Sequence, residues 1–309
     1  MRPPNVLRRW VLSSFFIICT VSNAFSAPLR IGILPDADSL PLMVAEAEGL
    51  YAKEGVEVLI VPFSNPQERD AAFQAGRLDG AISDLLAAAF FIAGGFEVRV
   101  ASATDGRYGI VAAPGSGIQN AAGLRGKKIG LSKNTIIQYG VDALLASRGL
   151  SMDAYDAVAV PKIPVRLEMV LAGQIDAAGL PEPMLTAAVQ RGAVLVATTD
   201  EARIDAGVLL FGKAVMDARL DEVRRFYKAY AAACAGINGN TDGYRSFLVE
   251  KAAFPAEIRT SFRFVSYRKP VLPEVKQVES VLEWLKARKL LSKEFRPSGM
   301  LDGRAVQGW

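Results

Sequence analysis

The sequence predicts an α/β protein built from two similar lobes, each a largely parallel sheet with helices on its faces. The first indication is a phrase that occurs twice, as AGRLDGAIS at Ala75–Ser83 and as AGQIDAAGL at Ala172–Leu180, 97 positions later. The second is that short apolar strands alternate with amphipathic helices around each copy. This alternation is typical of parallel sheets covered by helices.

The two halves are expected to run through the same five elements. In the first half we predict strands over 29–34, 56–61 and 80–82, with helices over 42–53 and 67–75. In the second half we predict strands over 127–132, 157–160 and 177–180, with helices over 135–147 and 165–172. Glycines that follow these helices, such as Gly76 and Gly173, are the usual signals of a helix end.

The remaining elements complete and connect the lobes. Strands over 97–103 and 108–113 are expected to finish the first sheet, and 114–126, with its four glycines, is the predicted crossover. A strand over 193–198 closes the second lobe and one over 207–212 leads back. Helices over 220–237, 241–250 and 272–289 then pack on the first lobe. Lobe one is therefore predicted as 28–113 plus 208–309 and lobe two as 114–207, joined by a hinge.

The N-terminus, residues 1–27, has the pattern of a secretory signal peptide. Basic residues precede the apolar run Trp10–Val21, and small residues follow it. The run is shorter than the roughly 20 residues that span a bilayer. We therefore expect a periplasmic protein, although a membrane anchor, a lipidated Cys19 and an Arg8-Arg9 twin-arginine signal are weaker alternatives. Without this segment the chain has 33 basic and 32 acidic residues, which gives no support for nucleic-acid binding.

The composition excludes several kinds of catalytic site. The chain contains no histidine, so it has no Ser-His-Asp or Cys-His pair and no HExxH zinc motif. Cys234 is the only cysteine outside the predicted signal peptide and is expected to be a buried thiol. The glycines of Gly115–Asn120 resemble a dinucleotide fingerprint, but Asn120 replaces its third glycine and the segment precedes a strand. We predict no catalytic residue, no metal and no cofactor.

Polar side chains follow the predicted strands of both halves. In open α/β sheets, ligands bind beyond the carboxyl ends of the strands, so these loops are expected to face one shared cleft. The predicted ligand-binding residues are Asp36, Asp38, Ser39, Ser83, Asp84, Ser132, Asn134, Thr135 and Glu182. Helix capping is an equal alternative for Ser83, Asp84 and Ser132. Asp79 and Asp176 lie at the opposite, amino-terminal ends and are interpreted as structural.

Longer stretches of the sequence point to a family. The segments AEGLYAKEGVEV, AFQAGRLDGAISD, LRGKKIG and VLAGQIDAAGLPEPM resemble the substrate-binding proteins of nitrate/sulfonate/taurine-type ABC importers, the SsuA/THI5-like, NMT1-like superfamily. The resemblance covers about 29–291 and implies a type II periplasmic-binding-protein fold that closes on its ligand. It also implies a monomer that docks on a membrane permease. The pocket loops of this superfamily fall on Asp36–Leu40, Ser83-Asp84, Ser132–Ile136 and Pro181-Glu182.

The acidic character of these loops bears on the ligand. The loops carry Asp36, Asp38, Asp84 and Glu182 against the single base Lys133. Because a buried carboxylate needs a partner, they favour a small organic solute with an amine, amidine or aminopyrimidine group, or a zwitterion. A sulfonate-type anion held by the helix starts near Ser83 and Thr135 is the alternative. The resemblance includes yeast-type pyrimidine synthases, which use an active-site histidine that this chain lacks. An enzyme acting through the acidic residues is the rival function, and a sensor is a third.

Overall fold

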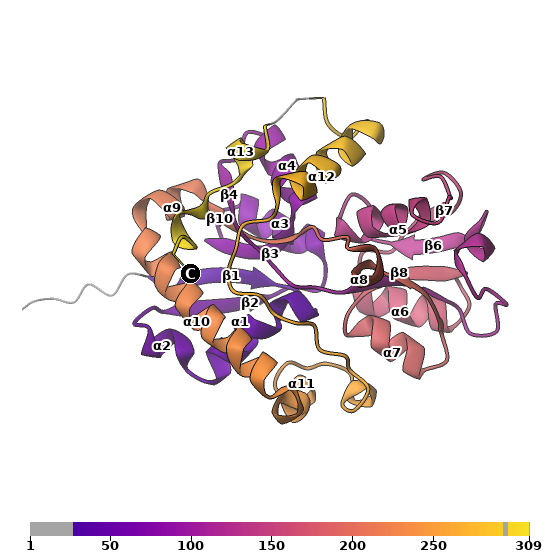
Figure 1. The fold of residues 1–309 in the computed structure, drawn as a ribbon, viewed down its shortest axis with the longest axis horizontal. Helices are drawn as coiled ribbons and strands as arrows, with labels where there is room; N and C mark the ends of the chain where they lie inside the picture. Colours follow the sequence, from indigo (N-terminus) through magenta and orange to yellow (C-terminus); the bar gives the residue numbers. More distant parts are fainter. Residues whose placement is uncertain (1–26, 293–295, 309) are drawn as a thin grey trace, which may run out of the picture.

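Two α/β lobes lie side by side in the computed structural model, which describes residues 27–292 and 296–308 (Figure 1). All of the predicted signal peptide except Ala27, including Cys19, lies outside these residues. Within the described ranges, no helix combines the length and the apolar character needed to cross a bilayer. The predicted two-lobed α/β architecture is confirmed.

The sheet of lobe one has the strand order β2-β1-β3-β10-β4. Its strands are β1 (Leu29–Ile33), β2 (Val58–Pro62), β3 (Gly80–Asp84), β4 (Val98–Ala103) and β10 (Gly207–Gly212). β1 runs parallel to β2 and β3, whereas β10 runs antiparallel to β3 and β4. The helices of this half are α1 (Leu40–Ala47), α2 (Leu50–Lys53), α3 (Pro66–Gln74) and α4 (Leu85–Ala93). Every residue of β3 is buried, as expected of a central strand covered on both faces.

The sheet of lobe two repeats this plan with the order β7-β6-β8-β5-β9. Its strands are β5 (Tyr108–Ala112), β6 (Lys128–Leu131), β7 (Asp156–Ala159), β8 (Ala177–Pro181) and β9 (Val194–Thr198). Its helices are α5 (Ile136–Ala146), α6 (Ile163–Leu171), α7 (Met184–Gln190) and the short α8 (Thr199–Ala202). β6 is parallel to β7 and β8, and β5 is antiparallel to β8 and β9.

The position of β5 corrects the predicted lobe boundary. We expected this strand to finish the first sheet, but it pairs with β8 and β9 of the second. The chain therefore crosses between the lobes at 104–107, between β4 and β5, and returns at 203–206, between α8 and β10. The boundary predicted at residue 113, with 114–126 as the crossover, is wrong. An apolar strand pattern shows that a strand is buried but does not show which sheet it joins.

The C-terminal third of the chain packs mainly on lobe one. It contains α9 (Lys213–Ala218), α10 (Leu220–Gly239), α11 (Arg245–Glu250), α12 (Val275–Ala287) and α13 (Pro297–Met300). In Figure 1 α10 lies along α1, and these two helices are in contact. The helix predicted over 241–250 is a 3₁₀ turn followed by α11. Cys234, on α10, is buried as predicted.

The duplication is visible in matching backbone contacts at the amino-terminal ends of the strands. The Asp79 carboxylate accepts a hydrogen bond from the Arg30 N–H at 2.8 Å, and Asp176 accepts one from Lys128 N–H at 2.8 Å. Both carboxylates thus satisfy the first strand of their own lobe, which confirms their structural interpretation.

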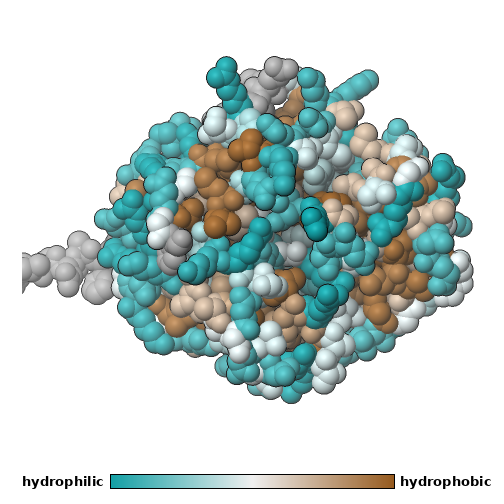
Figure 2. Space-filling model, viewed as in Figure 1, coloured by the Kyte–Doolittle hydropathy of each residue, from teal (hydrophilic) through white to brown (hydrophobic). Residues whose placement is uncertain are grey.

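The surface is mixed in character. On the face drawn in Figure 2, hydrophilic side chains predominate and apolar ones form separate patches, one of them over α6 and α7. The large apolar side chains that are exposed among the described residues are Leu59, Phe96, Val165, Val189, Leu195, Val271 and Val275.

Helix α12 braces lobe two as well as lobe one. It contacts α4, and two of its side chains reach Asp142 on α5: Trp284 Nε1 donates to Oδ2 at 2.9 Å and Arg288 Nε at 3.0 Å. The hydroxyl of Tyr155 donates to the other oxygen at 2.8 Å. Asp142 is 1 % exposed, so solvent does not reach its carboxylate and would not serve these donors as an alternative acceptor.

Replacing Asp142 with alanine is expected to lower the free energy of unfolding by about 3–5 kcal/mol, because it leaves the buried donors of Trp284 and Tyr155 and the partly buried Arg288 guanidinium without an acceptor. Urea unfolding measures this change. The matched control is Glu201→Ala, which removes an exposed ion pair to Arg148 and should cost less than about 1 kcal/mol. Equal effects of the two substitutions would show that α12 does not brace lobe two.

Candidate ligand-binding site

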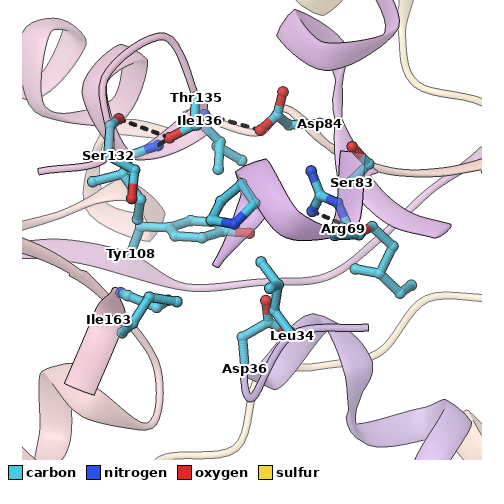
Figure 3. Close-up of a pocket in the computed structure, with 14 residues that line it drawn as sticks. Leu34, Asp36, Arg69, Ser83, Asp84, Tyr108, Ser132, Thr135, Ile136 and Ile163 are labelled. Atoms are coloured by element: carbon cyan, nitrogen blue, oxygen red, sulfur yellow. Dashed lines mark hydrogen bonds between the residues drawn. The ribbon is translucent and has the colours of Figure 1, made fainter. Parts of the chain in front are cut away.

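The carboxyl ends of the parallel strands of both lobes face one another across a small cavity (Figure 3). Lobe one contributes Leu34, Asp36, Pro66, Arg69, Ile82, Ser83 and Asp84. Lobe two contributes Tyr108, Ser132, Thr135, Ile136, Ile137, Ile163 and Pro181. The cavity measures about 30 Å³, which is room for one or two water molecules. In this conformation the lobes are closed, and an organic solute fits only if they move apart.

Five of the nine predicted site residues line this cavity: Asp36, Ser83, Asp84, Ser132 and Thr135. Asp36 follows β1, Ser83 and Asp84 are the last two residues of β3, and Ser132 and Thr135 follow β6, so all five lie at carboxyl ends of strands, as the duplicated sequence indicates. The other four, Asp38, Ser39, Asn134 and Glu182, lie nearby but do not line it.

Asp36 is the carboxylate with an unoccupied oxygen at the cavity wall. Its Oδ1 accepts hydrogen bonds from Ser39 N at 3.1 Å and Ser39 Oγ at 2.7 Å. No described residue donates to Oδ2. Burial raises the pKa of Asp36 well above its usual range, and the nearby Asp38 carboxylate raises it further. A cationic group next to Oδ2 would favour the ionised carboxylate and so offset the free-energy cost of burying its charge. Ser39 thus acts by orienting Asp36.

Asp38 contacts the segment by which the chain first crosses between the lobes. Thr104 Oγ1 donates to its Oδ1 at 2.6 Å and Tyr108 O–H donates to its Oδ2 at 2.6 Å. Gly106, on the first crossover, and Gly207, the first residue of β10, leave no room for a side chain: a Cβ on Gly106 would overlap the Asp38 carboxylate, and one on Gly207 would lie 2.7 Å from its Oδ1. Both oxygens are taken, so Asp38 fixes the crossovers rather than contacting a ligand.

Asp84 links the two lobes across the cleft. Its Oδ1 accepts from Ala87 N at 2.8 Å at the start of α4, and its Oδ2 accepts from Ile136 N at 3.1 Å at the start of α5. The helix-capping interpretation and the ligand-site interpretation therefore both apply to this residue. The contact to Ile136 also shows that the first turn of α5 accommodates a carboxylate.

Glu182 has no free group for a ligand, and Asn134 does not line the cavity. The Glu182 carboxylate is fully buried and accepts from Arg107 Nη1 at 2.8 Å, from Thr186 Oγ1 at 2.9 Å and from Thr186 N at 3.0 Å. A buried carboxylate with this many donors is already satisfied. Asn134 is exposed and has a left-handed backbone, with φ of 60°.

Besides apolar lining residues, the sequence did not point to three polar residues of the site. Arg69 and Tyr108 line the cavity, and Arg166 donates to the cavity residue Ser132 from behind. The duplication carried a signal for the arginines, because Arg69 and Arg166 lie 97 positions apart, the offset of the repeated phrase. Tyr108 carried no such signal, because its strand was assigned to the wrong sheet.

Two open sheets, a hinge of two crossovers and a cleft at the strand ends define the two-lobed fold of periplasmic binding proteins. Solved structures with this fold align over most of the chain. One is the alkanesulfonate-binding protein SsuA from Xanthomonas axonopodis pv. citri, bound to MOPS, with 19 % sequence identity and a TM-score of 0.77. The alignment covers 90 % of this chain and 99 % of the SsuA chain. The nitrate-binding protein NrtA from Synechocystis PCC 6803 is 14 % identical with a TM-score of 0.69 and covers 87 % and 83 %.

Within this fold, the chain belongs to the NMT1/THI5-like family, whose model matches residues 36–240. The matched segment includes all of the cavity-lining residues except Leu34. A curated relative is the 4-amino-5-hydroxymethyl-2-methylpyrimidine phosphate synthase of Schizosaccharomyces pombe, 27 % identical over 124 residues. The match covers 38 % of this chain and 35 % of the relative, so it spans about a third of that protein's length.

Proposed function

We propose that the chain is the periplasmic solute-binding component of an ABC importer, and that it captures a small organic solute with an amine, amidine or aminopyrimidine group. The signal-peptide pattern, the two-lobed fold and the family support the general role. The choice of ligand rests on Asp36. Its carboxylate is buried at the cleft, and no described residue donates a hydrogen bond to its Oδ2.

Capture requires the lobes to move about the hinge. The closed cavity is too small for such a solute, and Asp84 already joins the lobes through Ile136. In the proposed cycle the solute enters an open form and its contacts to both walls favour closure. A ligand shifts such an equilibrium only by the difference between its affinities for the two forms. The closed form then docks on a membrane permease.

A thermal-shift screen tests this function. The protein is unfolded, dialysed and refolded to remove bound solute, and then mixed with aminopyrimidines, amines, amino acids, sulfonates, nitrate and bicarbonate. A ligand at a hundred times its dissociation constant should raise the free energy of unfolding by about 2.7 kcal/mol. We expect compounds with a cationic or amino group to stabilise the protein. Stabilisation by simple anions alone would contradict the proposed ligand class.

An enzyme on the same fold is the second candidate, because the curated relatives are pyrimidine phosphate synthases. The raised pKa of the buried Asp36 would suit proton transfer near neutral pH. The stabilising solute should therefore be recovered and analysed by mass spectrometry after prolonged incubation. Recovery in unchanged form is the result expected of a binding protein, and conversion would identify an enzyme.

A further inference from the structure

Arg166 is a buried cation that no carboxylate of the described residues neutralises. It lies on α6 and is fully buried. Its Nη1 donates to Ser132 Oγ at 2.8 Å and to the Val160 carbonyl at 2.7 Å. Its Nε and Nη2 have no hydrogen-bond partner among the described residues, and no carboxylate of the described chain pairs with it. Burial lowers the pKa of Arg166 to about 9, so the group remains charged at neutral pH.

Arg69 of lobe one is the counterpart of Arg166 in the repeat, and it has an acidic partner beside it. Arg69 also donates to a strand carbonyl, that of Ile82, at 2.9 Å. It is neutralised within its own lobe by Asp70, at 2.7 Å. The position 97 residues after Asp70 is Leu167, which is buried. Lobe two therefore keeps the arginine of the repeat but has an apolar residue at the position of its counter-ion.

The uncompensated charge lies directly behind the cavity wall. Ser132 accepts from Arg166 and lines the cavity, so its own hydroxyl hydrogen is available to a group in the cleft. The longer contact from Ser132 Oγ to the Pro161 carbonyl, 3.4 Å, is a weak competitor. The first turn of α5, which follows Ser132 in the chain, already binds one carboxylate, because Ile136 N donates to Asp84 of lobe one. Figure 3 shows Ser132, Thr135 and Ile136 together on this wall, across the cavity from Asp36.

We propose that lobe two holds the anionic end of a zwitterionic solute through Ser132, with Arg166 as the positioning residue that supplies the charge. Asp36 of lobe one takes the cationic end. This inference rests on the proposed function and narrows its ligand class: the solute carries a carboxylate or sulfonate in addition to its amine. Closing the lobes on such a solute brings its cationic end to Asp36 and its anionic end to Ser132.

The test compares probes that differ only at the anionic end. We suggest 4-aminobutyrate against 4-aminobutanamide and 4-guanidinobutyrate against its amide, with calorimetric titration of refolded wild-type protein. The acid should bind at least thirtyfold more tightly than the amide. In Arg166→Met this ratio should fall to about threefold or less, and Arg166→Lys should restore part of it. The ratio is measured within one variant, so a partly unfolded fraction does not affect it.

Two further variants separate specificity from folding. Arg30→Met removes an arginine paired with Asp79 at the far end of the lobe-one sheet and should leave the ratio unchanged. Ser132→Ala keeps Arg166 but removes the hydroxyl and should reduce the ratio even if Arg166→Met fails to fold. Equal binding of acid and amide by the wild type would overturn the inference while leaving the proposed function standing. Failure of every probe and of the wider screen would overturn both.

Discussion

Replacing Asp36 with asparagine is expected to weaken binding of an amine-bearing solute by about tenfold to a hundredfold, and to stabilise the ligand-free protein at neutral pH. The first effect is the loss of a charge-assisted hydrogen bond, worth about 1.5–3 kcal/mol. The second arises because burial and the Asp38 carboxylate both oppose ionisation of Asp36. An amide keeps the hydrogen bonds from Ser39 and carries no charge.

The pH dependence has opposite signs for stability and for binding. The folded-state pKa of Asp36 is above its unfolded value, so the folded protein binds more protons between the two. Its contribution to stability is therefore complete below about pH 4, where the unfolded carboxyl titrates. It is lost as the pH rises through the raised pKa. Binding of a cation strengthens over the same range, because the ionised carboxylate is the form that binds.

Thermal unfolding and calorimetric titration of wild-type and Asp36→Asn protein across this pH range measure both effects. The matched control is Asp176→Asn, at the opposite end of the lobe-two sheet, where the carboxylate accepts from Lys128 N. It should lower stability somewhat and leave binding unchanged. An Asp36→Asn protein that binds the solute as tightly as the wild type would show that Asp36 does not hold the cationic group.

Replacing Gly106 with alanine is expected to cost about 3 kcal/mol of unfolding free energy and to weaken ligand binding severalfold. The new Cβ would overlap the Asp38 carboxylate, which is fixed by Thr104 and Tyr108. Overpacking of a buried site typically costs about 1–3 kcal/mol, and a displaced carboxylate loses hydrogen bonds as well. Because Gly106 lies on the first crossover, the displacement also changes how the lobes meet.

Gly239→Ala is the control for this substitution. No atom lies within 4 Å of the position that its Cβ would take, so the change should be within about 0.5 kcal/mol. Denaturant unfolding and titration of both variants separate the effect of space from that of losing a glycine. If Gly106→Ala were as stable and as tight in binding as Gly239→Ala, the hinge would not depend on the packing of Asp38.

The sequence alone predicted the architecture well because the duplication supplies two copies of the same evidence. Strand and helix periods, and the glycines that end the helices, repeat at an offset of 97 residues. The exchange of one strand between the sheets was not predictable in this way. β5 and β10 are both short apolar strands, and only long-range pairing decides which sheet each one joins.

The site was predicted in part for a related reason. A polar residue at a strand end marks its position, but its availability depends on partners that come from elsewhere in the chain. Glu182 is satisfied by Arg107, 75 residues away, and Asp38 by Thr104, 66 residues away. Arg166 is the opposite case: the repeat shows Leu167 where lobe one has Asp70, but only the structure shows that Arg166 is buried and donates to the cavity residue Ser132.

If the two lobes close on a solute bound between them, the distance between the lobes must change when the solute binds. Spin labels are attached in a Cys234→Ala background at Leu59→Cys on lobe one and Val165→Cys on lobe two, both of them exposed positions. Pulsed electron paramagnetic resonance is then recorded with and without the stabilising solute. The account predicts two populations without solute and one, the closed form, at saturation. A distance distribution that stays the same while the solute binds would contradict it.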